Sequence, residues 1–158
     1  MNNRWQDKRA LIIGAARQGQ ALARYLSIQG ARITLNDKTS MEELSSARQA
    51  LSDLPITWVC GSHPLELLDN IDVVFVSGGI PLTLPLIQET LQRGLPLSND
   101  TQVFMEICPC PMIGITGSAG KTTTTTLVGR IAQAGLPGSR RVWIGGNIGF
   151  PLIARLGK

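Results

Sequence analysis

Residues 10–19 read ALIIGAARQG, four apolar residues followed by a turn that begins and ends in glycine. The apolar run has the length and composition of a buried strand, and glycine permits the tight turn that leads from a strand into a helix. Residues 20–29 then carry apolar side chains at helical spacing and stop before Gly30, a common residue just past a helix end. The stretch predicts strand, glycine turn and helix, the first unit of a parallel α/β sheet.

The following residues repeat this alternation. The pattern predicts further strands over residues 32–35, 56–60, 72–76 and 95–97, and helices over 41–51 and 84–92. Ser40 and Glu43 have the spacing of a capping box at the start of the second helix. Strands that alternate with helices pair in parallel through right-handed crossovers, so we expect a Rossmann-like sheet that is covered on both faces.

A short segment, residues 107–111 with the sequence ICPCP, interrupts the alternation. Its two prolines cannot continue a helix, so the segment is interpreted as a linker. It divides the chain into a first domain, residues 1–106, and a second unit, residues 112–158. The second unit is expected to begin a phosphate-loop ATPase domain of the α/β class, for the reasons given next.

The strongest chemical signal lies in residues 114–123, GITGSAGKTT. A strand over 112–115, a glycine-containing loop and a helix over 121–134 would place backbone N–H groups and a helix N-terminus against a phosphate. Lys121 would neutralise the β- and γ-phosphates of ATP, and the Thr122 hydroxyl would bind Mg²⁺. The residues predicted to bind ATP are Thr116, Gly117, Ser118, Ala119, Gly120, Lys121, Thr122 and Thr123.

This loop departs from the strict phosphate-loop pattern, because Ile115 stands where a glycine is expected and the glycine is displaced to position 114. A glycine turn followed by Lys-Thr by chance is the alternative. The predicted strand and helix on either side of the loop favour the phosphate-binding interpretation. A further strand is expected over 141–144.

A second, weaker signal follows the first strand. Residues 14–19 have the outline of a dinucleotide fingerprint, with Ala16 in place of the middle glycine that lets a pyrophosphate approach. Asp37 closes the second strand, where an acid usually meets a ribose or a base. Residues 77–79, with the sequence SGG, end a neighbouring strand and belong to the same sheet edge. By themselves residues 14–19 fit a plain turn equally well; together the three features indicate a second phosphate-binding edge.

Charge and composition exclude several functions. The net charge is +4, but residues 1–106 contain all eleven acidic residues against nine basic ones, and residues 107–158 contain six basic residues and no acidic one. The basic residues are dispersed without interleaved aromatics, which argues against a nucleic-acid partner. No apolar run reaches the roughly 18 residues that cross a membrane, and the start lacks a secretory signal. A Mg·ATP site needs carboxylates, so we expect the chain to stop before its metal-binding acids.

The three cysteines are few and scattered, which argues against a disulfide framework and fits a reducing cytoplasm. Cys108 and Cys110 could form half of a metal site, which Cys60 and His63 would have to complete from distant positions. A linker that carries two cysteines is the simpler interpretation.

Three runs of the second unit carry a family resemblance: residues 115–123 (ITGSAGKTT), 126–129 (TLVG) and 145–152 (GGNIGFPL). Together with the two phosphate-binding edges, they resemble the N-terminal part of the Mur ligases, the ATP-dependent amide-forming enzymes of peptidoglycan synthesis. The chain departs from the family at Ala119, which is usually Asn, and at Gly78, where the most similar members commonly have Pro.

The resemblance is closest to members that join D-glutamate to UDP-N-acetylmuramoyl-L-alanine. It implies that ATP phosphorylates the alanine carboxylate, with Mg²⁺ as cofactor, and that the D-glutamate amine then displaces phosphate. The implied residues for the UDP-linked substrate are Gly14, Arg17, Gln18, Gly19, Asp37, Ser77, Gly78, Gly79 and Asn147. Because the family's remaining catalytic groups are expected beyond residue 158, the chain alone is expected to be inactive.

Three other interpretations remain at this point. They are another Mur-type ligase, a non-catalytic nucleotide-binding module, and a dinucleotide oxidoreductase, which leaves Lys121 and Thr122 unexplained. The strands expected over 112–115 and 141–144 would lack neighbours, so their exposed edges are expected to favour self-association.

Overall fold

The computed structural model describes residues 4–138, 140–146 and 150–156. Its centre is one five-stranded sheet, in which all neighbouring strands run parallel. The strands are β1 (Arg9–Ile13), β2 (Arg32–Asp37), β3 (Ile56–Cys60), β4 (Val73–Val76) and β5 (Leu97–Ser98). Their order, β3-β2-β1-β4-β5, is that of the doubly wound nucleotide-binding folds and confirms the predicted fold class of the first domain.

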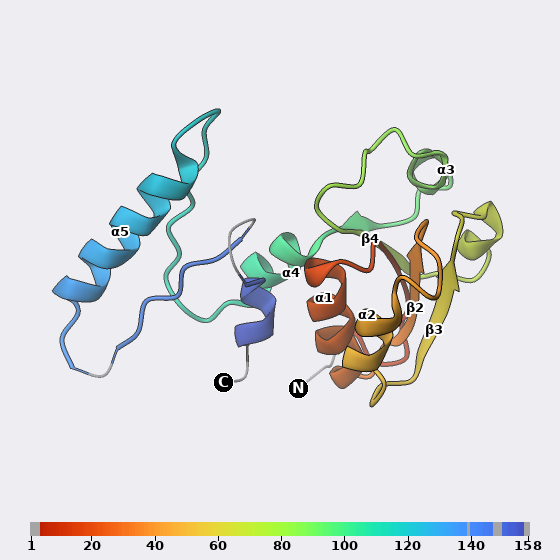
Figure 1. Cartoon of the computed structure of the whole chain (residues 1–158), viewed down its shortest axis with the longest axis horizontal. Helices are drawn as coiled ribbons and strands as arrows, with labels where there is room; N and C mark the ends of the chain where they lie inside the picture. Colours follow the sequence, from red (N-terminus) through yellow and green to blue (C-terminus); the bar gives the residue numbers. More distant parts are fainter. Residues whose placement is uncertain (1–3, 139, 147–149, 157–158) are drawn as a thin grey trace.

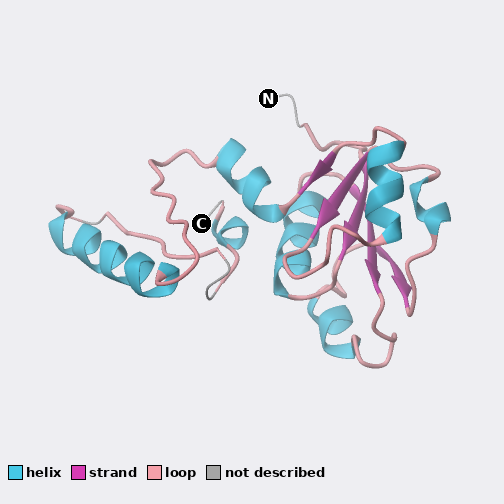
Figure 2. Cartoon of the chain, turned by 90° about the horizontal axis from the view of Figure 1, so that it is seen from above, coloured by secondary structure: helices cyan, strands magenta, loops and turns pink. Residues whose placement is uncertain are grey.

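Helices cover both faces of the sheet (Figure 2). The α-helices are α1 (Arg17–Ile28), α2 (Ser45–Ala50), α3 (Pro85–Gln92), α4 (Asp100–Ile107) and α5 (Lys121–Gly135), and the short 3₁₀ helices are η1 (Leu65–Leu68) and η2 (Leu152–Arg155). On one face, Leu26 of α1 and Val103 of α4 pack against alternate side chains of β1, β2 and β4. On the other face, Leu86 and Ile87 of α3 pack against the intervening side chains of β1 and β4.

The central strand β1 has the most complete burial. Ala10, Leu11, Ile12 and Ile13 are all fully buried, with successive side chains entering opposite core clusters. A parallel strand covered on both faces needs an uninterrupted apolar run, which explains why the sequence of β1 does not alternate with polar residues.

An ion pair joins two neighbouring strands, β1 and β4, at the amino end of the sheet. The Arg9 guanidinium at the start of β1 donates to both carboxylate oxygens of Asp72, just before β4. Hydrogen bonds from the Arg9 side chain and backbone lower the pKa of Asp72 to about 2.

Most predicted elements of the first domain are confirmed, with small differences at their ends. The capping box forms, with Glu43 N–H donating to the Ser40 hydroxyl and Ser40 N–H donating to the Glu43 carboxylate. The helix expected over 41–51 is nevertheless shorter, because residues 41–44 form turns before α2 begins at Ser45. The strand expected over 95–97 is β5, which begins only at Leu97.

Three elements of the described residues were not anticipated from the sequence. Asn99 caps α4 by accepting a hydrogen bond from the Gln102 N–H at 2.8 Å, so a helix occupies residues immediately before the proline segment. The 3₁₀ helices η1 and η2 also had no expected counterpart. The domain boundaries themselves stay predictions.

The strands expected over 112–115 and 141–144 are wrong, since neither segment has regular structure. A strand needs a hydrogen-bonding partner, and neither segment pairs with any described strand. The helix α5 forms as predicted because its hydrogen bonds are internal, and it stands apart from the sheet (Figure 1). Self-association through these segments stays a prediction.

The segment between α4 and η2, which carries α5 and is called the excursion below, is followed by a return of the chain to the sheet. The η2 helix contacts α1 and α4, and its Ile153 is only 2% exposed within the same core cluster as Leu26 and Val103. The segment that carries α5 therefore leaves from α4 and returns at η2, so both of its ends are attached to one body.

Replacing Ile153 with Ala should lower the free energy of unfolding by about 2–5 kcal/mol, because it leaves a cavity in the first domain's core. Urea unfolding followed by tryptophan fluorescence measures the change. The matched control is Ile131→Ala on α5, where the side chain is 71% exposed and little change is expected. Equal effects at the two positions would contradict the docking of η2.

Candidate functional site

The candidate site lies at the carboxyl edge of the sheet, at the end of the central strand β1. The next strand in the chain, β2, lies on one side of β1, and β4 lies on the other side. Such a switch point leaves a crevice between the loops that follow the two central strands, and it is where open parallel sheets bind ligands. Gly14 follows β1, Asp37 ends β2 and Ser77 follows β4, so the fold brings the three predicted features to one edge.

The first and third positions of the fingerprint require glycine. Gly14 has φ +101°, and a Cβ there would lie 2.9 Å from the Ser77 Cβ. A Cβ at Gly19 would lie 1.9 Å from the Gly14 carbonyl oxygen, so only glycine lets α1 approach the turn this closely. Ala16, in place of the middle glycine, is exposed and precedes the first residue of α1.

Hydrogen bonds join the loops after β1 and β4. The buried Ser77 hydroxyl donates to the Gly14 carbonyl at 2.9 Å, and the Ser77 N–H donates to the Ile13 carbonyl. Across the same gap, the Gly78 N–H donates to the Gln18 side-chain oxygen at 2.9 Å. The two loops are thereby held in one arrangement by the protein's own contacts.

Asp37 holds the glycine turn from the side of β2. One carboxylate oxygen accepts from the Ala15 N–H at 2.7 Å and the other from the Thr39 N–H at 2.9 Å. Burial opposes ionisation of Asp37, but these hydrogen bonds outweigh it and lower the pKa of the carboxyl group. Asp37 is thus an anion at neutral pH, with oxygen lone pairs left to accept from a ligand hydroxyl.

The remaining predicted substrate residues differ in what the structure shows of them. Arg17 is exposed in the first turn of α1, and Gly79 is exposed in the loop after β4. Asn147 lies outside the described residues.

Two polar residues that hydrogen-bond to the backbone of the glycine turn were not anticipated from the sequence. Asn36 is fully buried, its carbonyl accepts the Gly14 N–H, and its side chain contacts His63. The Gln20 amide donates to the Ala15 carbonyl at 2.7 Å. The signal available in the sequence was Asn36, an amide residue directly before Asp37 at the end of a predicted strand.

The predicted phosphate loop lies on the excursion, with α5 beginning at Lys121 directly after Gly120. The Lys121 ammonium donates to the Gly117 carbonyl, which folds the side chain back over the loop. Thr122 and Thr123 are exposed in the first turn, beside N–H groups that a helix start leaves without internal partners. Residues 116–123 therefore present an ammonium group, two hydroxyl groups and a helix start at the surface, although the strand expected before them is absent.

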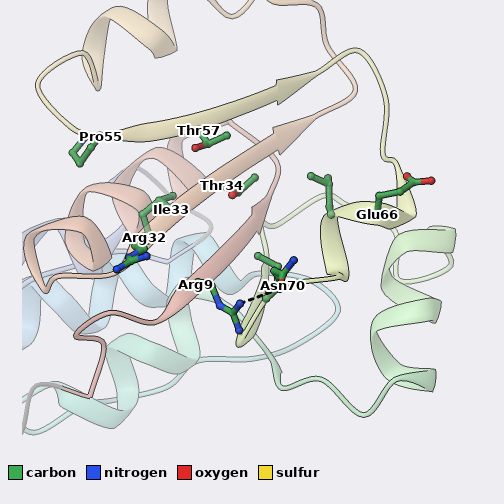
Figure 3. A pocket seen from close by; sticks show the side chains of 10 residues that line it. Arg9, Arg32, Ile33, Thr34, Pro55, Thr57, Glu66 and Asn70 are labelled. Atoms are coloured by element: carbon green, nitrogen blue, oxygen red, sulfur yellow. Dashed lines mark hydrogen bonds between the residues drawn. The ribbon is translucent and has the colours of Figure 1, made fainter.

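A hollow of about 480 Å³ lies elsewhere, toward the amino ends of β1, β2 and β3 (Figure 3). Arg9, Arg32, Thr34, Thr57 and Glu66 are among its lining residues. Because none of the predicted site residues lines it, the hollow and the candidate site are separate.

No three His, Cys, Asp or Glu side chains in the described part of the chain come together as a metal site. Nor does any helix within that part have the length and apolarity to span a bilayer.

Comparison with known proteins assigns the residues around the candidate site to a family. Residues 8–99 match the family described as "Mur ligase MurD-like, N-terminal domain". The chain is 41% identical over 150 residues to UDP-N-acetylmuramoylalanine--D-glutamate ligase of Symbiobacterium thermophilum, covering 95% of this chain and 32% of the relative. The same-named ligase of Geobacillus sp. is 44% identical over 146 residues, with 92% and 32% covered. The chain thus spans about a third of the length of these relatives.

Solved structures agree with the fold. The ligase for UDP-N-acetylmuramate and L-alanyl-gamma-D-glutamyl-meso-diaminopimelate from Neisseria meningitides has a TM-score of 0.55 at 24% identity, covering 92% of this chain and 46% of that one. A pseudomurein peptide ligase type C from Methanothermus fervidus has a TM-score of 0.52 at 22% identity, covering 82% and 27%. At these identities the similarity establishes the fold alone.

Replacing Gly19 with Ala should destabilise the chain by about 1–3 kcal/mol, because the new methyl group overlaps a backbone oxygen that cannot move without displacing β1. Thermal unfolding measures the loss. Gly114→Ala is the control, since a Cβ at Gly114 meets nothing within 4 Å. Wild-type stability of Gly19→Ala would show that α1 does not need this close approach.

Proposed function

This chain belongs to the family of Mur ligases with a MurD-like N-terminal domain, and we propose that it forms the substrate-binding domain and phosphate loop of a ligase that joins D-glutamate to UDP-N-acetylmuramoyl-L-alanine. The observation that carries the proposal is the pair of loops joined at the switch point of the sheet, within the residues that match the family.

The joined loops suit the diphosphate of the UDP-linked substrate. The N-terminus of α1 supplies N–H groups and a partial positive charge, and Arg17 in its first turn adds a full one. Gly78 and Gly79 present backbone without side chains from the opposite side. Asp37 would accept from the ribose or uracil end, as its ionised state and remaining lone pairs allow.

The phosphate loop would serve the other substrate, ATP. Lys121 would exchange its contact with the Gly117 carbonyl for the β- and γ-phosphate oxygens, and the Thr122 hydroxyl would hold Mg²⁺. The terminal phosphate of ATP passes to the alanine carboxylate with release of ADP, and the D-glutamate amine then attacks the acyl carbon and releases phosphate. Residues 107–158 contain no Asp or Glu, so carboxylate ligands for the metal would come from other parts of the whole enzyme.

The same proposal places the reaction in the cytoplasm, where ATP is available. The free thiols of Cys60, Cys108 and Cys110 fit that reducing compartment.

A titration of the ¹⁵N-labelled chain with UDP tests the first half of the proposal. We expect saturable shifts centred on the amides of Gly14, Gln18 and Gly78. Ser77→Ala removes the hydroxyl that holds the Gly14 carbonyl and should weaken UDP binding about tenfold. Ser52→Ala, which removes an exposed hydroxyl hydrogen-bonded to Gln49, should leave the affinity unchanged. Shifts centred on the hollow near Arg9, or equal binding of NADH, would contradict the assignment.

Calorimetry with Mg·ATP tests the second half. Lys121→Ala removes a charge-assisted contact and should weaken binding about tenfold to a hundredfold. Arg130→Ala is the matched control, since it removes one exposed positive charge from the same helix α5. Equal affinities of the Lys121→Ala chain and the wild type would remove the phosphate loop from the proposal.

A further inference from the structure

His63 is not among the substrate-binding or ATP-binding residues predicted from the sequence, yet it completes a part-buried hydrogen-bond network next to the glycine turn. Asn36, at the end of β2, is fully buried. Its side-chain amide donates to the Val59 carbonyl and to the Ser62 carbonyl, both at 2.8 Å, and its side-chain oxygen meets His63 Nδ1. The end of β2 is thereby tied to the end of β3 and to the turn that follows β3.

The network determines which ring nitrogen of His63 carries a proton. Both hydrogens of the Asn36 amide point to carbonyl oxygens, which fixes the orientation of the amide so that its oxygen, an acceptor only, faces His63. His63 Nδ1 must therefore be the protonated ring nitrogen that donates to it. This assignment follows from the hydrogen-bond partners, and it holds whether or not Nε2 also carries a proton.

The backbone of His63 is held in place by its neighbours in the chain. Pro64 follows it and caps η1, whose Leu68 is buried against the sheet. On the other side, the Gly61 N–H donates to the carbonyls of Asp37 and Thr39 at 3.0 Å each. The imidazole therefore reaches Asn36 from an anchored segment.

Asn36 transmits this contact to the candidate site. Its backbone carbonyl accepts the Gly14 N–H at 2.8 Å, and the next residue, Asp37, accepts the Ala15 N–H at 2.7 Å. The first two residues of the glycine turn are thus attached to consecutive residues of β2. A shift of Asn36 would move both attachment points together.

We infer that His63 is a positioning residue of the nucleotide site, whose Nδ1–H orients Asn36 and through it fixes the glycine turn against the substrate's UDP group. The inference rests on the proposed function for the identity of the ligand. Loss of the imidazole would leave the buried oxygen of Asn36 without its donor, and the Asn36 side chain would have to rotate away from Val59 or Ser62 to find another.

Three substitutions at one position test the role of the Nδ1 proton. The amide of an asparagine falls near the place of histidine Nδ1, whereas the longer glutamine places its amide near Nε2. We expect His63→Ala and His63→Gln to weaken UDP binding about tenfold, and His63→Asn to bind within about twofold of the wild type. In the free chain, the Gly14 and Ala15 amide resonances should move in the first two variants and stay near their wild-type positions in His63→Asn.

Thr90→Val separates positioning from general stability. The buried Thr90 hydroxyl donates to the Leu86 carbonyl at 2.7 Å within α3, away from the site, so its loss should lower the melting temperature without changing UDP affinity. Wild-type affinity in His63→Ala, a failure of His63→Asn to restore binding, or an equal loss in Thr90→Val would each overturn the inference. If the wild-type chain does not bind UDP, the proposed function fails, and the Gly14 and Ala15 resonances of the free variants still decide whether His63 positions the turn.

Discussion

The close approach of α1 to the end of β1 is the constraint on which the candidate site depends. Gly19 lies so near the Gly14 carbonyl that no side chain fits between them, and Gly14 itself lies against Ser77. This contact brings the helix N-terminus to the gap between β1 and β4, where N–H groups without partners inside the helix lie at the predicted phosphate-binding edge. Burial of β1 on both faces then holds the turn in a fixed place relative to the rest of the sheet.

Polar contacts within the protein hold the loops after β1 and β4 in place in the absence of a ligand. Ser77, Gln18 and Asp37 each use a side chain to hold a loop backbone, and Asn36 supports the same turn from beneath. Throughout the described residues, every buried side-chain nitrogen or oxygen has a hydrogen-bond partner. A loop held in this way would lose little further freedom on binding the proposed ligand.

The part of the chain that carries the predicted phosphate loop is organised differently. The helix α5 forms, whereas the apolar segments on either side of it remain irregular and partly exposed, with Ile113 and Trp143 at the surface. The excursion is nevertheless attached at both ends, through α4 before it and η2 after it. Arg155 of η2 also lies 4.6 Å from the ring centre of Trp143, a cation–π contact that links the returning segment to the anchored helix.

The sequence by itself determined the features that depend on near neighbours in the chain. The apolar run of β1, the glycines that flank its turn, the acid that ends β2 and the start of α5 at Lys121 all follow from propensity, spacing and turn chemistry. The predicted roles of these residues in binding remain predictions, because local spacing shows where a residue stands and no more.

Only the tertiary structure decided the features that depend on partners far away in the sequence. The segments 112–115 and 141–144 have the composition of strands but pair with no strand among the described residues, whereas a helix such as α5 supplies its own hydrogen bonds. Burial of Ile153 depends on α1 and α4, and the contact between His63 and Asn36 exists because parallel pairing brings the ends of β2 and β3 together. Long-range packing selects among local possibilities that are close in energy, and for this reason no local pattern reveals its outcome.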